Sequence, residues 1–500
     1  MKAWPWERLG GGRWLSGAGL AVLVALWAWV LASWPLQRAA ALLVAAGCGV
    51  AILVRPGLGL PLLALAIPFG SLRTVQVGPA AVGAEELLLG AIVVAWLVRQ
   101  AARRSLRLRW PPFAWAGLGL LAAMLVSFLP ASSPMLAVKE MLKWVELWLA
   151  GLLVLNVADE GDARLLVGGL LVAGAAQGLL GLYQFVARRG PPEFVLMGRF
   201  MRAAGTFDQP NPYGGYLGLT VPLAAGLVLT CWPGVATGPA RRRLWALWAP
   251  AAVAGGLMLG GIVASWSRGA WLGVAAGLGA VVVARGRRWL LGSLVAVAAA
   301  AALSLVVWGR LPLPNVLVQR FAEYAADLTT FDVRSVEVTD ANYAVVERVA
   351  HWQAAWAMFS ERPWTGVGLG NYPHVYERYA LPRWPEPLGH AHNYYLNIAA
   401  EAGLPGLVAY LLWAAAGLWL AARAVRRARG LWLGPALGAL GMWFYLAVHS
   451  LFDNLYVHGM GIQVGLLLGL AAWIIARGEL PASQPWGRLS SRRVESDVAS

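Results

Sequence analysis

Charged residues are scarce in this sequence. Only 13% of its 500 residues are Asp, Glu, Lys or Arg, whereas soluble domains carry roughly a quarter. Hydrophobic residues make up 59% of the chain, and its mean hydropathy is positive. This balance excludes an ordinary soluble globular protein and is typical of an integral membrane protein. A chain of this length has room for about a dozen or more spans of roughly 20 residues each.

Cysteines and acidic residues are also few. Cys48 and Cys231 are the two cysteines, and both fall in or at the end of apolar segments, which argues against a disulfide scaffold or a metal site. The 40 basic residues outnumber the 24 acidic ones, which gives a formal net charge of +16. On one soluble face this charge would indicate nucleic-acid binding. The arginines fall instead in short loops between apolar runs, so we expect no nucleic-acid partner.

Apolar runs predict fourteen transmembrane helices. The third run is short and bounded by Pro56 and Pro68, so it is expected to be re-entrant or tilted. The first is long for a signal peptide and is followed at once by another, so we expect an uncleaved span. The expected spans lie near 14–34, 36–54, 57–69, 83–99, 112–130, 137–157, 162–187, 212–232, 244–265, 269–285, 289–309, 393–422, 431–451 and 456–476.

The arginines between these runs predict the orientation. With the N-terminus inside, every arginine cluster falls in an inner loop, as the positive-inside rule requires. Omitting one span would move the later clusters outside, whereas a paired error would leave twelve spans and the same orientation. We therefore expect an all-α polytopic protein of 12–14 spans. The clusters are Arg99 to Arg109, Arg241 to Arg243, Arg285 to Arg288, Arg423 to Arg429 and Arg477 to Arg493.

One long polar segment interrupts the spans and is expected on the outer side. Apolar residues at helical spacing over 343–361 (Val345, Val346, Val349, Trp352, Trp356 and Phe359) predict an amphipathic helix, which Pro363 would end. The glycine-rich stretch 366–371 lacks a phosphate-loop lysine and a preceding strand, so we expect no nucleotide site there. The expected division is a bundle over 1–309, an outer loop domain over 310–392, C-terminal spans over 393–476 and an inner tail over 477–500.

Two histidines stand at the entrance to the helix that follows this segment. His392 is a candidate general base, because neutral imidazole is available near pH 7 to take a proton from a hydroxyl group. A helix-capping role is the structural alternative. Together, His390 and His392 could hold a metal ion, but a four-ligand site needs further partners. We therefore expect no metal.

The other polar residues of the outer side have plainer interpretations. His351 and His374 are expected at the surface. Glu401 lies 2.5 turns beyond His392 and so points elsewhere, which predicts a buried hydrogen-bonding partner of neighbouring spans. Four residues around the last outer turn could line the same cavity, although helix packing is the simpler expectation for each: His449, Asp453, Asn454 and His458.

Several arginines flank the outer mouth, where few are expected. Arg268 lies in a tight turn between two apolar runs, Arg348 lies on the amphipathic helix, and Arg199 and Arg202 precede a turn-rich stretch. Singly, each could be a snorkelling, ion-paired or loop arginine. Together they predict a phosphate site, because the guanidinium group offers two parallel donors. With no DxD or DxxD cluster nearby, the arginines themselves would neutralise a leaving diphosphate.

These residues resemble the O-antigen ligase family, which includes O-antigen polymerases and some protein O-oligosaccharyltransferases. Four matches, in order over roughly residues 200–460, carry the resemblance. They are Gly205-Thr206-Phe207 to Asn211-Pro212; Ser267-Arg268-Gly269; Glu347-Arg348 to Trp352, with Pro363 and Gly366-Val367-Gly368; and His392-Asn393 to Leu396, with Glu401, Gly403 and Gly406.

The resemblance implies a glycosyltransferase of the bacterial inner membrane, with both termini cytoplasmic and the active site outside. It would transfer a glycan from undecaprenyl diphosphate to lipid A–core or a similar hydroxyl by a metal-independent, inverting mechanism without a cofactor. A polymerase of O-antigen or exopolysaccharide with the same chemistry stays open. A transporter or flippase of a lipid-linked or small anionic solute is the alternative from another class. The expected catalytic residues are His392, Arg268 and Arg348, and the expected substrate contacts are Arg199, Arg202, Asn211, His390 and Asn393.

Overall fold

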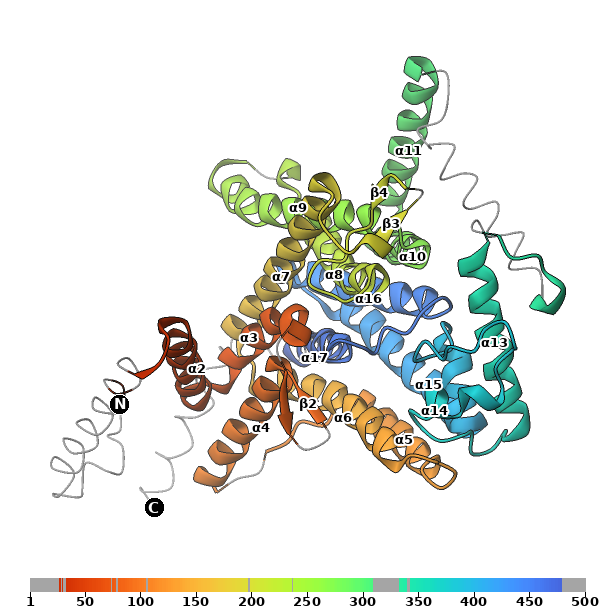
Figure 1. The fold of residues 1–500 in the computed structure, drawn as a ribbon. Coiled ribbons are helices and arrows are strands. Elements are labelled where there is room, and N and C mark those ends of the chain that lie inside the picture. Colours follow the sequence, from red (N-terminus) through yellow and green to blue (C-terminus); the bar gives the residue numbers. More distant parts are fainter. Residues whose placement is uncertain are drawn as a thin grey trace.

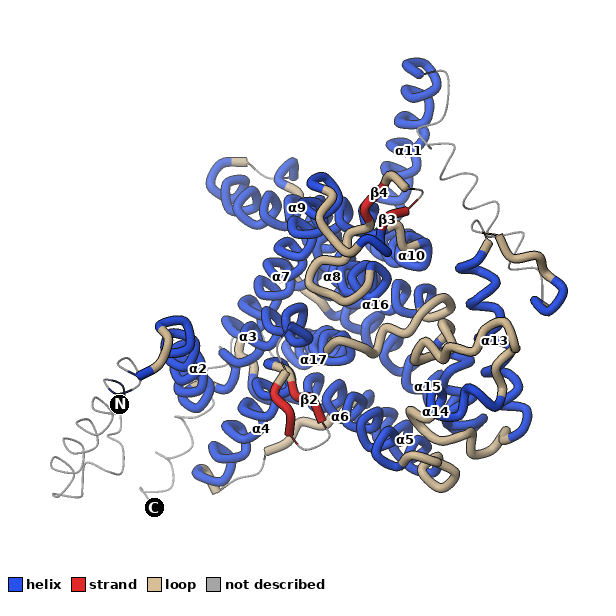
Figure 2. The backbone as a smooth tube through the Cα atoms, viewed as in Figure 1, coloured by secondary structure: helices blue, strands red, loops and turns tan. Residues whose placement is uncertain are grey.

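The computed structural model is an almost entirely helical membrane protein, which confirms the predicted fold class (Figures 1 and 2). Among its described residues, eight helices are long and apolar enough to cross a membrane. Two antiparallel hairpins supply the strands of the described chain, β1 (Val75–Val77) with β2 (Ala80–Val82) and β3 (Val195–Leu196) with β4 (Phe200–Met201). The structure describes residues 27, 29, 33–72, 74–77, 80–104, 107–196, 198–235, 237–308, 332–339 and 342–478.

From the second expected span onward, each predicted run coincides with a helical segment. Most of the first expected span, residues 310–331 of the outer loop and most of the C-terminal tail lie outside the described residues. The short third run is helical in three pieces, η2 (Pro56–Leu58), α3 (Gly59–Ala66) and η3 (Ile67–Leu72). The remaining bounds are α2 (Leu36–Val54), α4 (Ala84–Ala102), α5 (Pro112–Val126), α6 (Pro134–Val157), α7 (Glu160–Ala187), α8 (Pro210–Thr230), α9 (Gly238–Ser265), α10 (Arg268–Arg285), α11 (Arg287–Trp308), α15 (Tyr394–Arg427), α16 (Leu433–His449) and α17 (Met460–Gly478).

Helix ends follow local sequence signals. Pro112, Pro134 and Pro210 each stand at the first helical position, where the missing N–H costs nothing and the fixed φ suits a helix. At the start of α7, the side chain of Asp159 accepts a hydrogen bond from Asp162 N–H, and the side chain of Asp162 accepts one from Asp159 N–H. This reciprocal cap fixes the start of α7, and Arg55 at the end of α2 pairs with both carboxylates.

The core of the bundle lies around α17, which Figure 1 places between the other helices. Of its apolar stretch, 89% is buried, compared with 11% for α2 at the edge of the bundle. Glycines bring α17 close to α6, since a Cβ at Gly465 would lie 2.2 Å from the carbonyl oxygen of Leu147. Small residues at such crossings let helix backbones approach closely where no hydrophobic effect draws helices together.

The described part of the outer segment folds onto the start of α15. It contains η6 (Val333–Ser335), α13 (Tyr343–Glu361), α14 (Tyr372–Val375) and η7 (Tyr376–Arg378). The predicted amphipathic helix is therefore confirmed as α13, and Val345, Val346 and Val349 are buried as expected. Trp356 is instead 59% exposed, because α13 turns a face with Ala354, Ala355 and Met358 toward the protein.

A break inside α15 anchors this segment. Gly403 has φ 65° and ψ −169°, so the helix hydrogen bonds are interrupted there. The freed carbonyl groups of Ala400 and Glu401 accept hydrogen bonds from Val367 N–H (2.9 Å) and Gly368 N–H (3.0 Å). In return, Leu404 N–H donates to the carbonyl of Pro363 at 2.7 Å. The glycine-rich stretch is thus a backbone strut that fixes the outer segment to α15.

Candidate functional site

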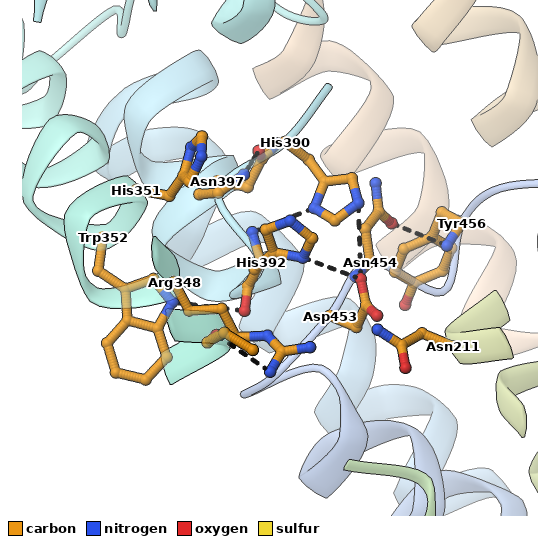
Figure 3. Close-up of polar contacts among 12 residues, drawn as sticks. Asn211, Arg348, His351, Trp352, His390, His392, Asn397, Asp453, Asn454 and Tyr456 are labelled. Atoms are coloured by element: carbon orange, nitrogen blue, oxygen red, sulfur yellow. Dashed lines mark hydrogen bonds and ion pairs between the residues drawn. The ribbon is translucent and has the colours of Figure 1, made fainter. Parts of the chain in front are cut away.

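The turn that leads into α15 carries His390 and His392, and both side chains face Asp453 (Figure 3). His390 Nε2 and His392 Nδ1 each lie 3.5 Å from Asp453 Oδ1. Asp453 comes from the turn after α16, 61 positions further along the chain. The candidate base therefore has a buried carboxylate beside its ring, the arrangement that orients a catalytic imidazole.

The histidine turn is held in an uncommon conformation. His392 has φ 51°, in the left-handed region that non-glycine residues seldom adopt. The amide oxygen of Asn397 accepts a hydrogen bond from Ala391 N–H at 3.0 Å, and Tyr394 N–H donates to the carbonyl of Ser450 at 2.8 Å. Strained residues of this kind are retained at functional sites, where the surrounding structure holds them in place.

Asn393, a predicted substrate contact, caps α15. Its side-chain oxygen accepts a hydrogen bond from Leu396 N–H at 3.1 Å. That oxygen is therefore engaged in starting the helix, as N-cap residues commonly are. The capping role weighed for His392 belongs to its neighbour, so His392 is left without that structural explanation.

A hydrogen bond assigns the proton of the His390 ring. His390 Nδ1 accepts a hydrogen bond from His392 N–H at 3.1 Å, so its own proton lies on Nε2, toward Asp453. Burial, followed by the charge of His392, lowers the pKa of His390 to about 3, and the ring stays neutral near pH 7. A proton on His392 Nδ1 would likewise point to Asp453 and leave Nε2 as the basic nitrogen.

Asp453 remains ionised within this cluster. Burial alone would raise its pKa, but hydrogen bonding and charge from His392, with further contributions from His390 and His449, hold that pKa well below its usual range. An ionised carboxylate stabilises the imidazolium that forms when a histidine takes a proton. Asp453 is thus suited to assist His392 as a base.

His351 forms another wall of the cluster and is buried, which corrects the expected surface position. It is only 1% exposed, its Nδ1 lies 2.9 Å from the hydroxyl of Tyr372, and its ring stacks on Tyr376 with 4.7 Å between centroids. The ring centroids of His351 and His392 are 5.8 Å apart. Burial and the charge of His392 lower the pKa of His351 to about 4, so it contributes a neutral wall. His374 is exposed, as expected.

A pocket next to this cluster brings together three of the predicted arginines. Arg202, Arg268 and Arg348 line it with Asn211 and Asp453. Arg202 Nε donates to the carbonyl of Ser265 at 2.9 Å, and its Nη2 donates to Asn211 Oδ1 at 3.0 Å. Asp453 also contacts His392, so the arginine pocket and the histidine cluster share this carboxylate.

Arg268 is placed by the tight turn between α9 and α10. Trp266 ends α9 in the left-handed conformation, with φ 54° and ψ 22°. Arg268 is the first residue of α10, and it is only 9% exposed. The next residue, Gly269, packs on His449, where a Cβ would lie 2.9 Å from ring carbon Cδ2. The close approach of α10 and α16 therefore requires glycine and sets the depth of Arg268.

Arg348 reaches the pocket from α13. Its Nε is buried and has no hydrogen-bond partner among the described residues, while its Nη1 is 3.5 Å from the carbonyl of Ala344. Three arginines and one carboxylate leave the described lining with a net charge of +2. An anion that accepts hydrogen bonds from several guanidinium groups fits this charge, and a diphosphate is such an anion.

Two other predicted residues lie away from the pocket. Arg199 is exposed, and its guanidinium lies 5.2 Å from the ring centroid of Phe200. Glu401 is buried, as expected, but it accepts a hydrogen bond from Tyr372 N–H at 3.1 Å, so its partner is the outer segment and not a neighbouring span. Glu347, one residue before Arg348, belongs to the matched stretch but was given no role at the site. Burial raises its pKa, and the charge of His392 lowers it.

Asp453 and His449 lie closer to the candidate site than their sequence positions predicted. Both were expected to serve helix packing, but both line the arginine pocket. His449 Nδ1 lies 2.6 Å from the hydroxyl of Tyr445, which donates to the carbonyl of Gly214 at 3.0 Å. The one available signal was the clustering of polar residues in a short turn between two apolar spans.

We expected no metal at these histidines, but the histidines and Asp453 are arranged as a possible metal-ligand set. Ligand atoms of His390, His392 and Asp453 all lie within 4.8 Å of one another. Two imidazoles and a carboxylate are a common ligand set for zinc, which would take a fourth ligand from water or substrate. Chelation is therefore part of any test of this site.

Residues 253–411 match the family model described as O-antigen ligase. The matched stretch includes Arg268, Arg348, His390 and His392, and it ends before Asp453. A search of curated proteins found no match to the chain.

Proposed function

We propose that this member of the O-antigen ligase family, whose matching domain spans residues 253–411, transfers a glycan from undecaprenyl diphosphate to an acceptor hydroxyl. His392 acts as the general base, with Asp453 behind it. Arg268 and Arg348, together with Arg202, bind the diphosphate. The site would lie on the outer face of a bacterial inner membrane, and lipid A–core or a similar glycan would supply the hydroxyl.

The reaction is a single displacement at the anomeric carbon. The acceptor O–H proton moves to His392 Nε2, and the acceptor oxygen forms a bond to that carbon from the face opposite the diphosphate. The bond from the carbon to the diphosphate oxygen breaks, and its electron pair leaves with the diphosphate. The configuration is inverted, and the arginines stabilise the charge that develops on the leaving group.

One observation carries the proposal: Asp453 belongs both to the histidine cluster and to the arginine pocket. A base and a leaving-group site must flank the same reacting carbon, so they must adjoin one another. The net charge of +2 among the described lining residues suits a diphosphate bonded at both ends, with one negative charge on each phosphate. The buried Nε of Arg348 would gain an acceptor from such a ligand.

A polymerase of O-antigen or exopolysaccharide would use the same base and the same arginines, so it differs only in its acceptor. A flippase or transporter would need a polar path through the bundle. The helices inward of this pocket are packed by apolar cores that include Tyr445, Leu446 and α17, which favours an enzyme over a transporter.

Transfer by the purified full-length protein tests the proposal. A defined glycan on undecaprenyl diphosphate would be offered with lipid A–core, a growing glycan or an acceptor protein, and the product identified by mass spectrometry. We expect His392→Ala to abolish transfer and Arg268→Lys to reduce it about a hundredfold, because an ammonium group cannot replace a bidentate donor.

Arg199→Lys is the matched control, because Arg199 is exposed and does not line the pocket. Transfer by His392→Ala at the wild-type rate, in protein that is correctly inserted and monodisperse, would remove the base assignment. Loss of activity on chelation, restored by zinc, would replace the base mechanism with a metal centre at His390, His392 and Asp453.

A further inference from the structure

A second pocket lies at the opposite end of α15 from the histidines. Its walls are formed by the segment before α5, the C-terminal turns of α6 and α15, and the last turns of α17. Arg423 in this pocket follows Tyr394 by 29 positions on the same helix, a separation on the order of 40 Å. The pocket is therefore separate from the glycan-transfer site.

Two arginines give this pocket a positive rim, and none of the described residues that line it is acidic. Arg109 is fixed through its backbone, since its N–H donates to Asn156 Oδ1 at 2.7 Å and its carbonyl accepts from Asn156 Nδ2 at 3.1 Å. The guanidinium of Arg423 lies 5.3 Å from the ring centroid of Trp419. Desolvation lowers the pKa of Arg109.

The wall below the arginines is apolar. Leu155, Leu420 and Ile475 come from three different helices and face the pocket. Trp419 is 45% exposed, and Leu412, two turns earlier on α15, is 64% exposed. Residues seven apart share a helix face, so this wall continues along the lipid-facing side of α15. A ligand that combines an anion with a hydrocarbon chain fits both parts of the site.

We propose that this pocket binds an anionic phospholipid, with its headgroup phosphate at Arg109 and Arg423 and an acyl chain along α15. Basic pockets between helices at the cytoplasmic interface suit acidic headgroups. Trp110 and Trp419 also line the pocket, and indole rings commonly anchor helices in the headgroup region. The lipid would join the inner ends of α5, α6, α15 and α17, independently of glycan transfer.

Lipid retention by the full-length protein tests this proposal. The protein would be reconstituted in nanodiscs of phosphatidylcholine with increasing phosphatidylglycerol, and lipid bound after extraction would be counted by native mass spectrometry. We expect the wild-type protein to retain phosphatidylglycerol. The affinity for this lipid should be about thirtyfold weaker in the double variant Arg109→Gln/Arg423→Gln, since each arginine contributes to headgroup attraction. Phosphatidylcholine should not be retained.

The matched control is Arg426→Gln/Arg427→Gln, which removes two exposed arginines from the same end of α15 outside the pocket. Equal loss in both double variants would mean general surface attraction and would overturn the site. Competition by millimolar inorganic phosphate that empties the pocket would identify a soluble-anion site instead. If the double variant is not monodisperse, the single variants Arg423→Gln and Arg426→Gln provide the same comparison.

Discussion

At the scale of single residues, the site depends on one carboxylate that serves two groups. Asp453 faces His392 on one side and lines the arginine pocket on the other. A carboxylate among arginines weakens anion binding, because it repels the diphosphate. Its presence is understandable if its main role is to orient His392 and to stabilise the protonated ring.

Asp453→Asn separates these two effects. We expect kcat to fall about a hundredfold or more, because the amide cannot stabilise imidazolium as a carboxylate does. The KM for the lipid-linked donor should stay constant or fall, since a negative charge is removed beside the arginines. Steady-state kinetics with a defined donor measures both. Asp208→Asn is the control, as Asp208 is exposed near the same mouth. A raised donor KM at unchanged kcat would contradict the orienting role.

At the scale of elements, the decisive feature is the break in α15. The histidine turn lies just before the first turns of this helix, and the strut from the outer segment attaches at Gly403, less than three turns later. The outer segment and the base are therefore held by the same short piece of helix. This arrangement explains how α13 can present Arg348 to the pocket even though it belongs to a segment outside the bundle.

Gly403→Ala tests the strut. The added Cβ would lie 2.6 Å from the carbonyl carbon of Trp364, and the backbone angles of Gly403, nearly exclusive to glycine, cost another residue about 1–3 kcal/mol. We expect faster tryptic cleavage within 362–392 and a several-fold loss of transfer. In the control Gly90→Ala, the Cβ meets nothing within 4 Å in α4, so stability should hold or rise slightly. Equal protease resistance of both variants would show that the break in α15 is dispensable.

Sequence patterns predicted the helices and some of the residues that the structure brings together in the candidate site. Arginines such as Arg268 and Arg348 stood out because positive charge on the outer side is unusual. His392 stood out because it opens a long apolar helix. Asp453 and His351 could not be assigned in this way. The position of Asp453 depends on how α16 packs beside α15, and the burial of His351 depends on which face α13 turns inward.

At the scale of the whole molecule, the two pockets lie at opposite ends of α15, a helix of 34 residues. One end carries the histidine cluster, and the other carries Arg423, Arg426 and Arg427. A helix of this length crosses a bilayer even with a break near its start. The positive-inside rule therefore predicts that the histidine cluster faces outward and that the pocket of Arg109 and Arg423 faces the cytoplasm.

Cysteine labelling tests this orientation. In a background with Cys48→Ala and Cys231→Ala, single cysteines would replace exposed Glu386 on the histidine side and exposed Arg429 on the arginine side. In sealed right-side-out vesicles, a membrane-impermeant maleimide should label Glu386→Cys and reach Arg429→Cys only after permeabilisation. Labelling of both variants after detergent confirms that both thiols are reactive. The reverse pattern would place the histidines in the cytoplasm, where an extracytoplasmic acceptor could not reach them.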